Sequence, residues 1–589
     1  MPRVPFGLAL LAVGLMYLLG LGAAPFLDPP EGFHAAIAES LRQSGDWITL
    51  RVNGVRYFDK PPLTYWLMAL SFAAAGATEA AARVWPALAA IGVAAVTGRI
   101  GMILGGPRLG LLAGLFVAAN TGIFVFGREV KPDLVFILFL TLAHAGFVVA
   151  YRGGGRWGLA LFYASLGLAA LAKDVLGAVG PLAVVALFVW LTRERPYGVW
   201  APWWGLAILL AIALPWYLAV ELRNPGFLWY TVVDNHLLNF TRQRVFPDED
   251  VPLGALQFLG VTLLAFLPWA LAVPWALGRA LRRPWPDAQA RLWTLLALWA
   301  VIVVGFFTVS PFKLPHYGLP AFPALALLAA LDRLPLPSGA LENVDVTARN
   351  LAARGQTAAG APLEAYRPVL VKCTVIFGAA TVAMALAVRR RWPAVGVGVA
   401  LAAMIAFLPT AGEGMAQFAR GRSARPVTEA LARRLGPADR VIHEGALENT
   451  GSLLLVARRT VHVVHGLQSN LAFGATFPDA RDAFWSVARV QEAWSGTGRC
   501  FLVSTVDPRR SVAGSLQPRH LLAQGGGRWL YSNVADPSTT PATTGPSAGA
   551  GAPGRLAGGR PHHVRGVVVD EAPAVGAALE EVGGEDGGH

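Results

Sequence analysis

The chain has 589 residues, of which 55% are hydrophobic and only 14% are charged, and its mean hydropathy is +0.50. This composition excludes an ordinary soluble protein and indicates a polytopic membrane protein. The net charge of +13 comes from arginine-rich loops, which suit anionic lipid surfaces, so we do not expect nucleic-acid binding. The two cysteines, Cys373 and Cys500, predict neither a disulfide framework nor a cysteine-based metal site.

The first apolar segment, residues 5–27, is predicted to be a retained membrane helix, because it is longer than the apolar part of a typical signal peptide. A polar first loop, residues 26–81, follows it and concentrates acidic and basic side chains. Pro29 and Pro30 are expected to end the helix and to hold the neighbouring acids in a rigid turn. Residues 63–76 are apolar but short, which leaves open a juxtamembrane helix or part of a tilted span.

Further apolar runs are long enough to cross a membrane. They are residues 82–104, 107–126, 132–151, 157–172, 175–192, 201–221, 255–277, 291–310, 314–332, 370–388 and 393–411. Basic turns between them predict which loops are cytoplasmic, and the first loop then lies on the opposite side together with 127–133, 222–252 and 310–317. A count of twelve spans puts Arg389–Arg391 on the wrong side. We therefore expect 11 to 13 spans, with a missed span or re-entrant segment within 63–81 or 333–369.

The character of the sequence changes after the last apolar run. Residues 412–533 alternate helix-like and strand-like segments, which predicts a small soluble α/β domain, expected on the extracytoplasmic side. Residues 534–589 are rich in Pro, Gly, Ala, Ser and Thr, and we expect them to be a disordered tail. The predicted architecture is thus an all-α membrane domain, residues 1–411, followed by the α/β domain and the tail.

Ionisable residues near the membrane edge are the first candidates for chemistry, because such positions are costly unless paired or functional. Lys60 can hold a lipid phosphate, or it can be a snorkelling lysine or the surface partner of Asp59. Asp133 can serve as a functional acid or as a helix cap, or as both. His236 can be a metal ligand, a phosphate contact or a buried, hydrogen-bonded histidine.

Two later motifs add polar groups between apolar spans. The segment SPFKLPHYGLP places Lys313, His316 and Tyr317 in a compact cluster. In LAKDVLG, we interpret Lys173 and Asp174 as a mutually neutralised pair. No G-x-x-x-x-G-K-[ST] phosphate loop occurs in the sequence, so nucleotide-driven transport has no support.

Taken in order, these motifs carry a family resemblance. The first loop contains SGDW, NGVRYFDKPPLTYW and Ala81-Ala82-Arg83, and GREVKPD, LAKDVLG, NHLLNF and KLPHYGLPAFPALALL follow. The set resembles the superfamily of protein O-mannosyltransferases and aminoarabinose transferases, which are membrane glycosyltransferases of the GT-C fold (family 39). The match covers about residues 5–330 and, more loosely, the chain to about 530. It implies a polyprenyl-phosphate sugar donor, a catalytic acid on the first loop and transfer on the extracytoplasmic face.

The resemblance also implies roles for the donor-binding residues. Tyr57 and Lys60 match the family's aromatic and phosphate-binding positions, and Tyr317 matches a tyrosine that contacts the donor phosphate. The leaving group is an anion that needs cationic stabilisation, which Lys60 and either Arg242 or Lys313 can supply.

A metal site is implied in some relatives only. There, a histidine matching His236 helps to hold a metal together with the acid at the position of Asp59. Two ligands alone make a weak site. The sequence therefore establishes no cofactor, and a divalent metal ion is the one candidate that it suggests.

The chain departs from the family at one important place. The position of the usual catalytic aspartate holds Pro30, which has no proton to move. An acceptor hydroxyl needs a nearby carboxylate as general base, so Asp28 or Glu31 is predicted to take over, with Asp133 holding the acceptor or orienting the base. Glu31 is slightly favoured because it shares the second acidic position of the family's pair.

The predicted function is therefore that of an integral membrane glycosyltransferase. It would transfer a sugar from a polyprenyl-phosphate donor, such as an undecaprenyl phosphate, to a hydroxyl of a lipid, glycan or protein, with inversion. The active site would face outward from the bacterial inner membrane, in a setting such as cell-envelope or lipid A modification. Two alternatives stay open: an inactive relative that binds polyprenyl-linked lipids, and a transporter or flippase of lipid-linked sugars.

Overall fold

The computed structural model of the chain describes residues 12–246, 253–331, 363–467 and 469–535. The chain divides into two units, Met1–Val534 and Ala535–His589. Apart from its first two residues, the predicted low-complexity tail, residues 534–589, lies outside the described residues.

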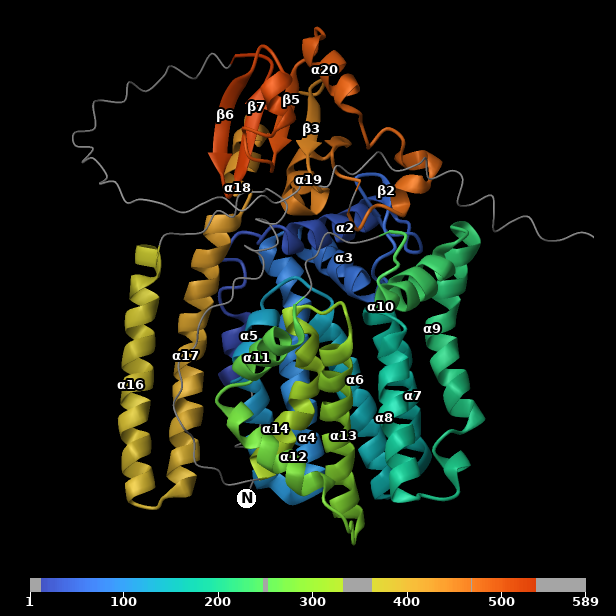
Figure 1. Ribbon diagram of the computed structural model, residues 1–589, viewed down its shortest axis with the longest axis vertical. Helices are drawn as coiled ribbons and strands as arrows, with labels where there is room; N and C mark the ends of the chain where they lie inside the picture. The colour runs from blue at the N-terminus through green and yellow to red at the C-terminus, as the bar shows by residue number, and fades with distance from the viewer. Residues whose placement is uncertain (1–11, 247–252, 332–362, 468, 536–589) are drawn as a thin grey trace, which may run out of the picture. The chain divides into compact units, whose positions relative to one another are not determined.

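Long apolar helices dominate the first unit (Figure 1). Among the described residues, six helical stretches are long and apolar enough to cross a membrane, or seven if a bent pair counts as one span. The six contain α4 (Glu79–Ala118), α6 (Asp133–Val149) with α7 (Gly155–Ala172), α9 (Trp203–Arg223), α13 (Ala288–Val309), α16 (Arg367–Arg389) and α17 (Pro393–Arg422). The bent pair is α11 (Ala255–Ala265) and the stretch Trp269–Leu281, which contains α12 (Val273–Leu281). The predicted class of a polytopic, mostly helical membrane protein is confirmed.

The predicted number of 11 to 13 spans is larger for two reasons: shorter apolar helices such as Leu176–Thr192 are not among the six, and glycines divide two of the six stretches. In α4, Gly105 and Gly106 have non-helical backbone angles, and a Cβ on Gly101 would lie 2.9 Å from the Cα of Gly110. The two halves of α4 therefore fold back on each other. A similar break at Gly153 (φ 97°) separates α6 from α7, which pack side by side (Figure 1). Each of these stretches thus supplies two of the predicted spans.

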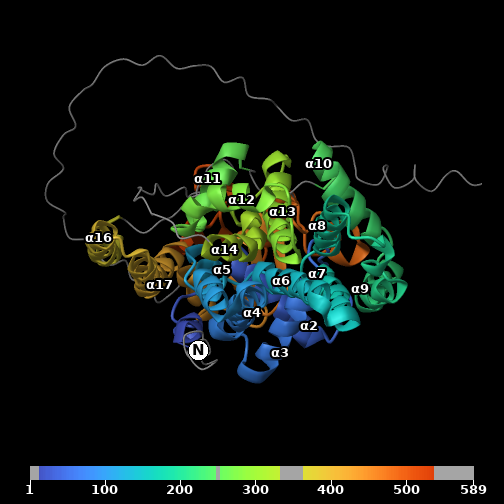
Figure 2. The same ribbon diagram turned by 90° about the horizontal axis from the view of Figure 1, so that it is seen from below.

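Shorter helices complete the membrane part. They are α5 (Thr121–Phe126), α8 (Leu176–Thr192), α10 (Asn239–Thr241), α14 (Phe322–Leu331), the π-helix η3 (Trp229–Leu238) and the 3-10 helix η5 (Pro315–Ala321). Seen from below in Figure 2, α16 and α17 pair to one side of the cluster that contains α4, α6 and α14.

The first loop folds over one end of these helices (Figure 1). It forms α2 (Pro30–Ser44), a hairpin of β1 (Arg51–Val52) and β2 (Val55–Arg56), and α3 (Leu63–Ala75). Helix α2 begins at Pro30. Proline suits the first position of a helix, because its fixed φ is helical and the missing N–H would have no partner there. It ends where Gly45 adopts a left-handed conformation (φ 69°). The prolines therefore start α2 as well as ending the segment before it.

The chain after α17 forms an α/β region, residues 423–535, built on a five-stranded sheet of order β4-β3-β5-β7-β6. Strands β3 (Arg440–Glu444), β4 (Val461–Val464) and β5 (Cys500–Ser504) are parallel, and β7 (Arg528–Ser532) runs antiparallel to both of its neighbours, β5 and β6 (His520–Gly525). Successive side chains of a strand point to opposite faces of the sheet. Val441 packs on one face, in an apolar cluster with residues of α18 (Arg425–Ala432), α19 (Ser452–Ala457) and α2. Ile442 packs on the other face, in a cluster with residues of α20 (Val487–Ser495). The predicted α/β character is confirmed, while α17 runs across the predicted boundary at 411/412.

The α/β region packs directly against the first loop. Helices α2 and α19 approach so closely that a Cβ on Gly32 would lie 2.4 Å from the Ser452 nitrogen, and one on Gly451 would lie 2.2 Å from the Phe33 nitrogen. Only glycine permits this backbone contact. Together, the first loop and the α/β region form one end of the unit.

Candidate active site

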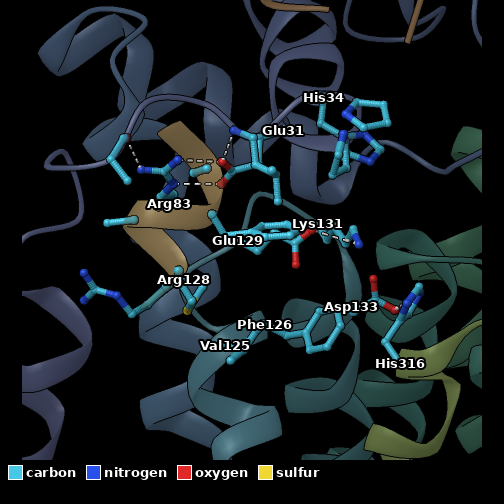
Figure 3. A pocket seen from close by; sticks show the side chains of 18 of the residues that line it. Glu31, His34, Arg83, Val125, Phe126, Arg128, Glu129, Lys131, Asp133 and His316 are labelled. Carbon is cyan, nitrogen blue, oxygen red and sulfur yellow. Dashed lines mark hydrogen bonds and ion pairs between the residues drawn. The ribbon is translucent and has the colours of Figure 1, made fainter. Parts of the chain in front are cut away.

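A cavity of about 970 Å³ lies where the first loop, the helices and the α/β region meet. Its walls come from residues far apart in the chain, within segments 16–34, 57–60, 124–133, 312–317, 365–369, 409–420, 446–449 and 469–470, together with Arg83 and Lys173. Charged and polar side chains gather on the wall formed by α2 and the loop before α6 (Figure 3). The cavity therefore brings together most of the polar motifs that the sequence placed in separate loops.

Three lysines line this cavity, and each makes an ion pair with a carboxylate that also lines it. The pairs are Lys60–Asp59 (2.5 Å), Lys131–Glu129 (2.9 Å) and Lys173–Asp133 (2.5 Å). We call these six residues the lysine–acid cluster. Each pair balances its own charge, so the cluster presents three ammonium groups without a large net charge.

Asp133 occupies the first position of α6, where the helix dipole favours a negative charge. Besides Lys173, it lies 3.6 Å from His316 Nε2, and the Lys173 ammonium stands 4.7 Å above the ring of Tyr317. The interpretation of Lys173 and Asp174 as a pair is wrong, because Asp174 instead accepts the backbone N–H of Leu176 (2.8 Å). Lys173 reaches across the bundle to an acid 40 residues earlier in the chain.

His34 and Tyr57 line the cavity together with Lys60, and the buried Tyr65 contacts both of them. His34 Nδ1 hydrogen-bonds to the Tyr65 hydroxyl (2.9 Å), which lies 3.4 Å from the hydroxyl of Tyr57. Burial, reinforced by the positive charges of Lys60 and Lys131, lowers the pKa of His34 to about 3. The imidazole is therefore neutral at physiological pH and adds no charge to the cluster.

Asp59 and His236, the residues proposed for a metal, each contact another partner in this structure. Burial alone would raise the pKa of Asp59, but Lys60 and Arg244 outweigh it and hold that pKa below its usual value. From the later loop, the Asn235 amide lies 3.5 Å from Asp59. His236 instead places Nδ1 2.5 Å from the Thr231 carbonyl oxygen and does not line the cavity. Within the described residues, no three His, Cys, Asp or Glu side chains cluster as metal ligands would.

Glu31, the favoured general base, is held by a dense set of donors. Arg83 donates Nε to Oε1 (2.8 Å) and Nη2 to Oε2 (2.5 Å), and the backbone nitrogens of Leu27 (2.7 Å) and Val130 (3.0 Å) donate as well. Both side chains are almost completely buried. A carboxylate with a bidentate guanidinium and two amides is poorly placed to take a substrate proton, so the geometry points to a structural role (Figure 3).

Asp28, the other candidate base, faces away from the cavity. It accepts hydrogen bonds from the Ser452 hydroxyl (2.6 Å), the Ser452 nitrogen (3.3 Å) and the Ala424 nitrogen (3.4 Å), and it does not line the cavity. Its carboxylate therefore ties the first loop to the α/β region.

Two of the predicted donor-binding residues also lie elsewhere. Arg242 is exposed at the end of α10 with φ 61°, and Lys313 donates to the Ser310 carbonyl oxygen. Neither lines the cavity, whereas Tyr57, Lys60 and Tyr317 do.

Sequence reasoning missed two cavity residues that lie inside a motif it used. Glu129 and Lys131 belong to GREVKPD, together with Asp133. The alternation of charged residues at 129, 131 and 133 is a usable signal, because every second residue of an extended segment points to the same side. Lys173 was noticed but paired with the wrong acid.

Comparison with known proteins follows the same regions. Residues 33–231 match the family model described as dolichyl-phosphate-mannose-protein mannosyltransferase. An undecaprenyl phosphate-α-4-amino-4-deoxy-L-arabinose arabinosyl transferase of Aeromonas salmonicida (strain A449) is 29% identical over 329 residues, which cover 55% of this chain and 58% of that protein. A transferase of the same name from Pseudomonas aeruginosa (strain UCBPP-PA14) is 29% identical over 57% of this chain and 61% of its own. This chain thus spans somewhat under two thirds of these relatives.

The fold comparison reaches further along the chain. The crystal structure of ArnT from Cupriavidus metallidurans bound to undecaprenyl phosphate matches with a TM-score of 0.74 and 25% identity, over 91% of this chain and 99% of that one. In fold, the chain is thus a polytopic membrane protein of the GT-C type. The predicted resemblance to the superfamily of protein O-mannosyltransferases and aminoarabinose transferases is confirmed in both sequence and structure.

Proposed function

We propose that the protein is a membrane glycosyltransferase that takes a sugar from a polyprenyl-phosphate donor and places it on a hydroxyl of a lipid, glycan or protein. The observation that carries this proposal is the lysine–acid cluster in the cavity, next to apolar helix surfaces. The relatives named for undecaprenyl phosphate-linked aminoarabinose support a donor of the undecaprenyl class.

The cluster suits a phosphate that becomes a leaving group. When the bond between the anomeric carbon and the phosphate oxygen breaks, negative charge grows on the phosphate. Preorganised ammonium groups in a partly buried site stabilise such charge strongly. Lys60, Lys131 and Lys173 would provide this stabilisation, and Tyr57 and Tyr317 would border the headgroup.

The remaining cavity wall suits the prenyl chain. Apolar residues of the first segment and of α17 line it, among them Met16, Leu19, Met415 and Phe418. A cavity with a charged end and an apolar wall fits an amphiphilic lipid better than a soluble nucleotide sugar. From the basic turns of the sequence, we place the cavity on the extracytoplasmic side of the bacterial inner membrane.

One observation favours a second candidate, an inactive relative that binds polyprenyl-linked lipids. Pro30 occupies the family's acidic position and lines the cavity. The lysines could then bind the lipid phosphate without any transfer.

The test is an assay of purified protein in lipid nanodiscs. Undecaprenyl phosphate-α-4-amino-4-deoxy-L-arabinose and dolichyl phosphate-mannose serve as donors, with envelope extracts as acceptors, and mass spectrometry detects transferred sugar and released polyprenyl phosphate. We expect turnover of at least one donor and its loss in Lys173→Ala, while the exposed control Arg42→Ala stays active. Binding of undecaprenyl phosphate with no turnover of either donor would support the inactive relative instead.

A further inference from the structure

The proposed reaction needs a proton acceptor that the expected position cannot supply. Pro30 replaces the family's acid, Glu31 is saturated by Arg83 and two amides, and Asp28 points into the α/β region. One of the other carboxylates that line the cavity therefore has to remove the proton of the acceptor hydroxyl, and those nearest the lysines are Asp59, Glu129 and Asp133.

Glu129 lies at the centre of the cavity wall, between the Glu31–Arg83 pair and Asp133 (Figure 3). Its side chain lines the cavity and its Oε1 lies 2.9 Å from Lys131 Nζ. Unlike Glu31, whose carboxylate meets a guanidinium and two amides, Glu129 forms an ion pair with one lysine within the described part of the chain. Glu129 therefore combines access to the cavity with a partner lysine that lines the same cavity.

The backbone on both sides of Glu129 is fixed. The guanidinium of Arg128 donates to the carbonyl oxygens of Met16 (3.0 Å), Tyr17 (2.9 Å) and Leu19 (2.8 Å). On the other side, the Val130 nitrogen donates to Glu31. Because both neighbours are anchored, the carboxylate is presented to the cavity without a further loss of backbone entropy on binding.

The charged groups around Glu129 also suit a base. Burial raises the pKa of Glu129, and the negative charges of Glu31 and Asp133 add to this effect, while Lys131 opposes it. A carboxylate with a raised pKa accepts a proton more readily near neutral pH than an ordinary glutamate does.

We infer that Glu129 is the general base of the transfer reaction, in place of the acid that Pro30 replaces. This inference rests on the proposed function. Lys131 would turn to the donor phosphate when the donor binds. The acceptor oxygen then forms a bond to the anomeric carbon and its proton passes to Glu129, while the electron pair of the broken bond leaves with the polyprenyl phosphate.

The same geometry makes Glu31 and Arg83 positioning residues. The pair anchors Val130, the residue after Glu129, and Arg83 also holds the carbonyl oxygens of Leu21 and Ala24 (both 2.7 Å). Loss of the pair would displace the base without removing it.

The test compares Glu129→Gln, Glu129→Asp and the exposed control Glu429→Gln in the nanodisc assay, with undecaprenyl phosphate binding measured in parallel. Loss of a general base typically lowers the rate ~100- to 10,000-fold, so we expect that loss in kcat for Glu129→Gln, partial activity for Glu129→Asp, and undecaprenyl phosphate bound by all three. The acid limb of the pH–rate profile should shift in Glu129→Asp and disappear from the residual activity of Glu129→Gln.

The outcomes separate this inference from the proposed function. An active parent whose Glu129→Gln variant keeps its rate within about threefold, or keeps the same acid limb, overturns the role of Glu129 and leaves the transferase intact. A parent that turns over neither donor overturns both.

Discussion

Replacing Arg83 by methionine tests whether Glu31 is structural or catalytic. Arg83 and Glu31 are 4% and 2% exposed, respectively, and four donors converge on the Glu31 carboxylate. Methionine keeps much of the volume of the arginine stem but leaves the Glu31 charge buried with only two amide donors.

The expected cost follows from this geometry. Breaking a buried ion pair by removing one partner typically destabilises a protein by about 3–5 kcal/mol, because the remaining charge is uncompensated. The pair Arg42–Glu39 (2.7 Å), whose side chains are 39% and 14% exposed, is the control, since a surface helix pair contributes only about 0.3–0.5 kcal/mol. Arg83→Met should therefore lower the apparent melting temperature clearly, whereas Arg42→Met should leave it almost unchanged.

The assay is thermal unfolding in detergent, followed by fluorescence-detected gel filtration, with a double variant Arg83→Met/Glu31→Gln included. Removing the charge from both partners should restore part of the lost stability, because the two effects are coupled. The structural reasoning is refuted if Arg83→Met is no less stable than Arg42→Met. It is also refuted if Glu31→Gln keeps parental stability and loses all transfer, which is the behaviour of a catalytic base.

Three further predictions concern other parts of the cavity and fold. Lys60→Ala should weaken undecaprenyl phosphate binding by ~1.5–3 kcal/mol, or roughly ten- to 150-fold in Kd, because a charge-assisted contact is lost; unchanged binding would reject the phosphate role. Gly451→Ala places a Cβ 2.2 Å from the Phe33 nitrogen and should cost about 1–3 kcal/mol in thermal unfolding, whereas Gly514→Ala, which meets nothing within 4 Å, should cost far less. Because the pKa of His34 is lowered to about 3, the unfolded chain binds the extra proton between that pH and about 6.5, so stability should fall as pH drops through this window, by up to about 1.4 kcal/mol per pH unit. His34→Asn should flatten that slope in pH-dependent melting curves, and a slope equal to the parent's would contradict the assignment.

The sequence predicted the architecture because it is recorded in local patterns. Long apolar runs, the glycines that divide them and the alternating elements of the last segment can each be recognised from a window of about twenty residues. The ordered motifs also identified Tyr57, Lys60, Asp133 and Tyr317, all of which line the cavity. These residues were accessible because each stands out against an apolar or proline-rich neighbourhood.

The roles of the acids were harder to predict, because an acid takes its role from its partner. Glu31 meets Arg83 52 residues later, and Asp28 meets Ser452 424 residues later. Neither contact leaves a trace in the local sequence. Lys173 likewise pairs with Asp133 rather than with its neighbour Asp174, which instead accepts the backbone N–H of Leu176 at the start of α8.

The close contact between α2 and α19 has a consequence for how the protein is made. The first loop emerges early in synthesis, yet its Asp28 and Gly32 meet partners around Ser452, near the end of the described chain. Contacts of such high sequence separation form late, because a long loop must close before they contribute. The first loop therefore lacks its packing partner until all the later membrane helices have been synthesised. A chain that ends before residue 452 can still insert its membrane helices, but it lacks helix α19, which packs against the first loop.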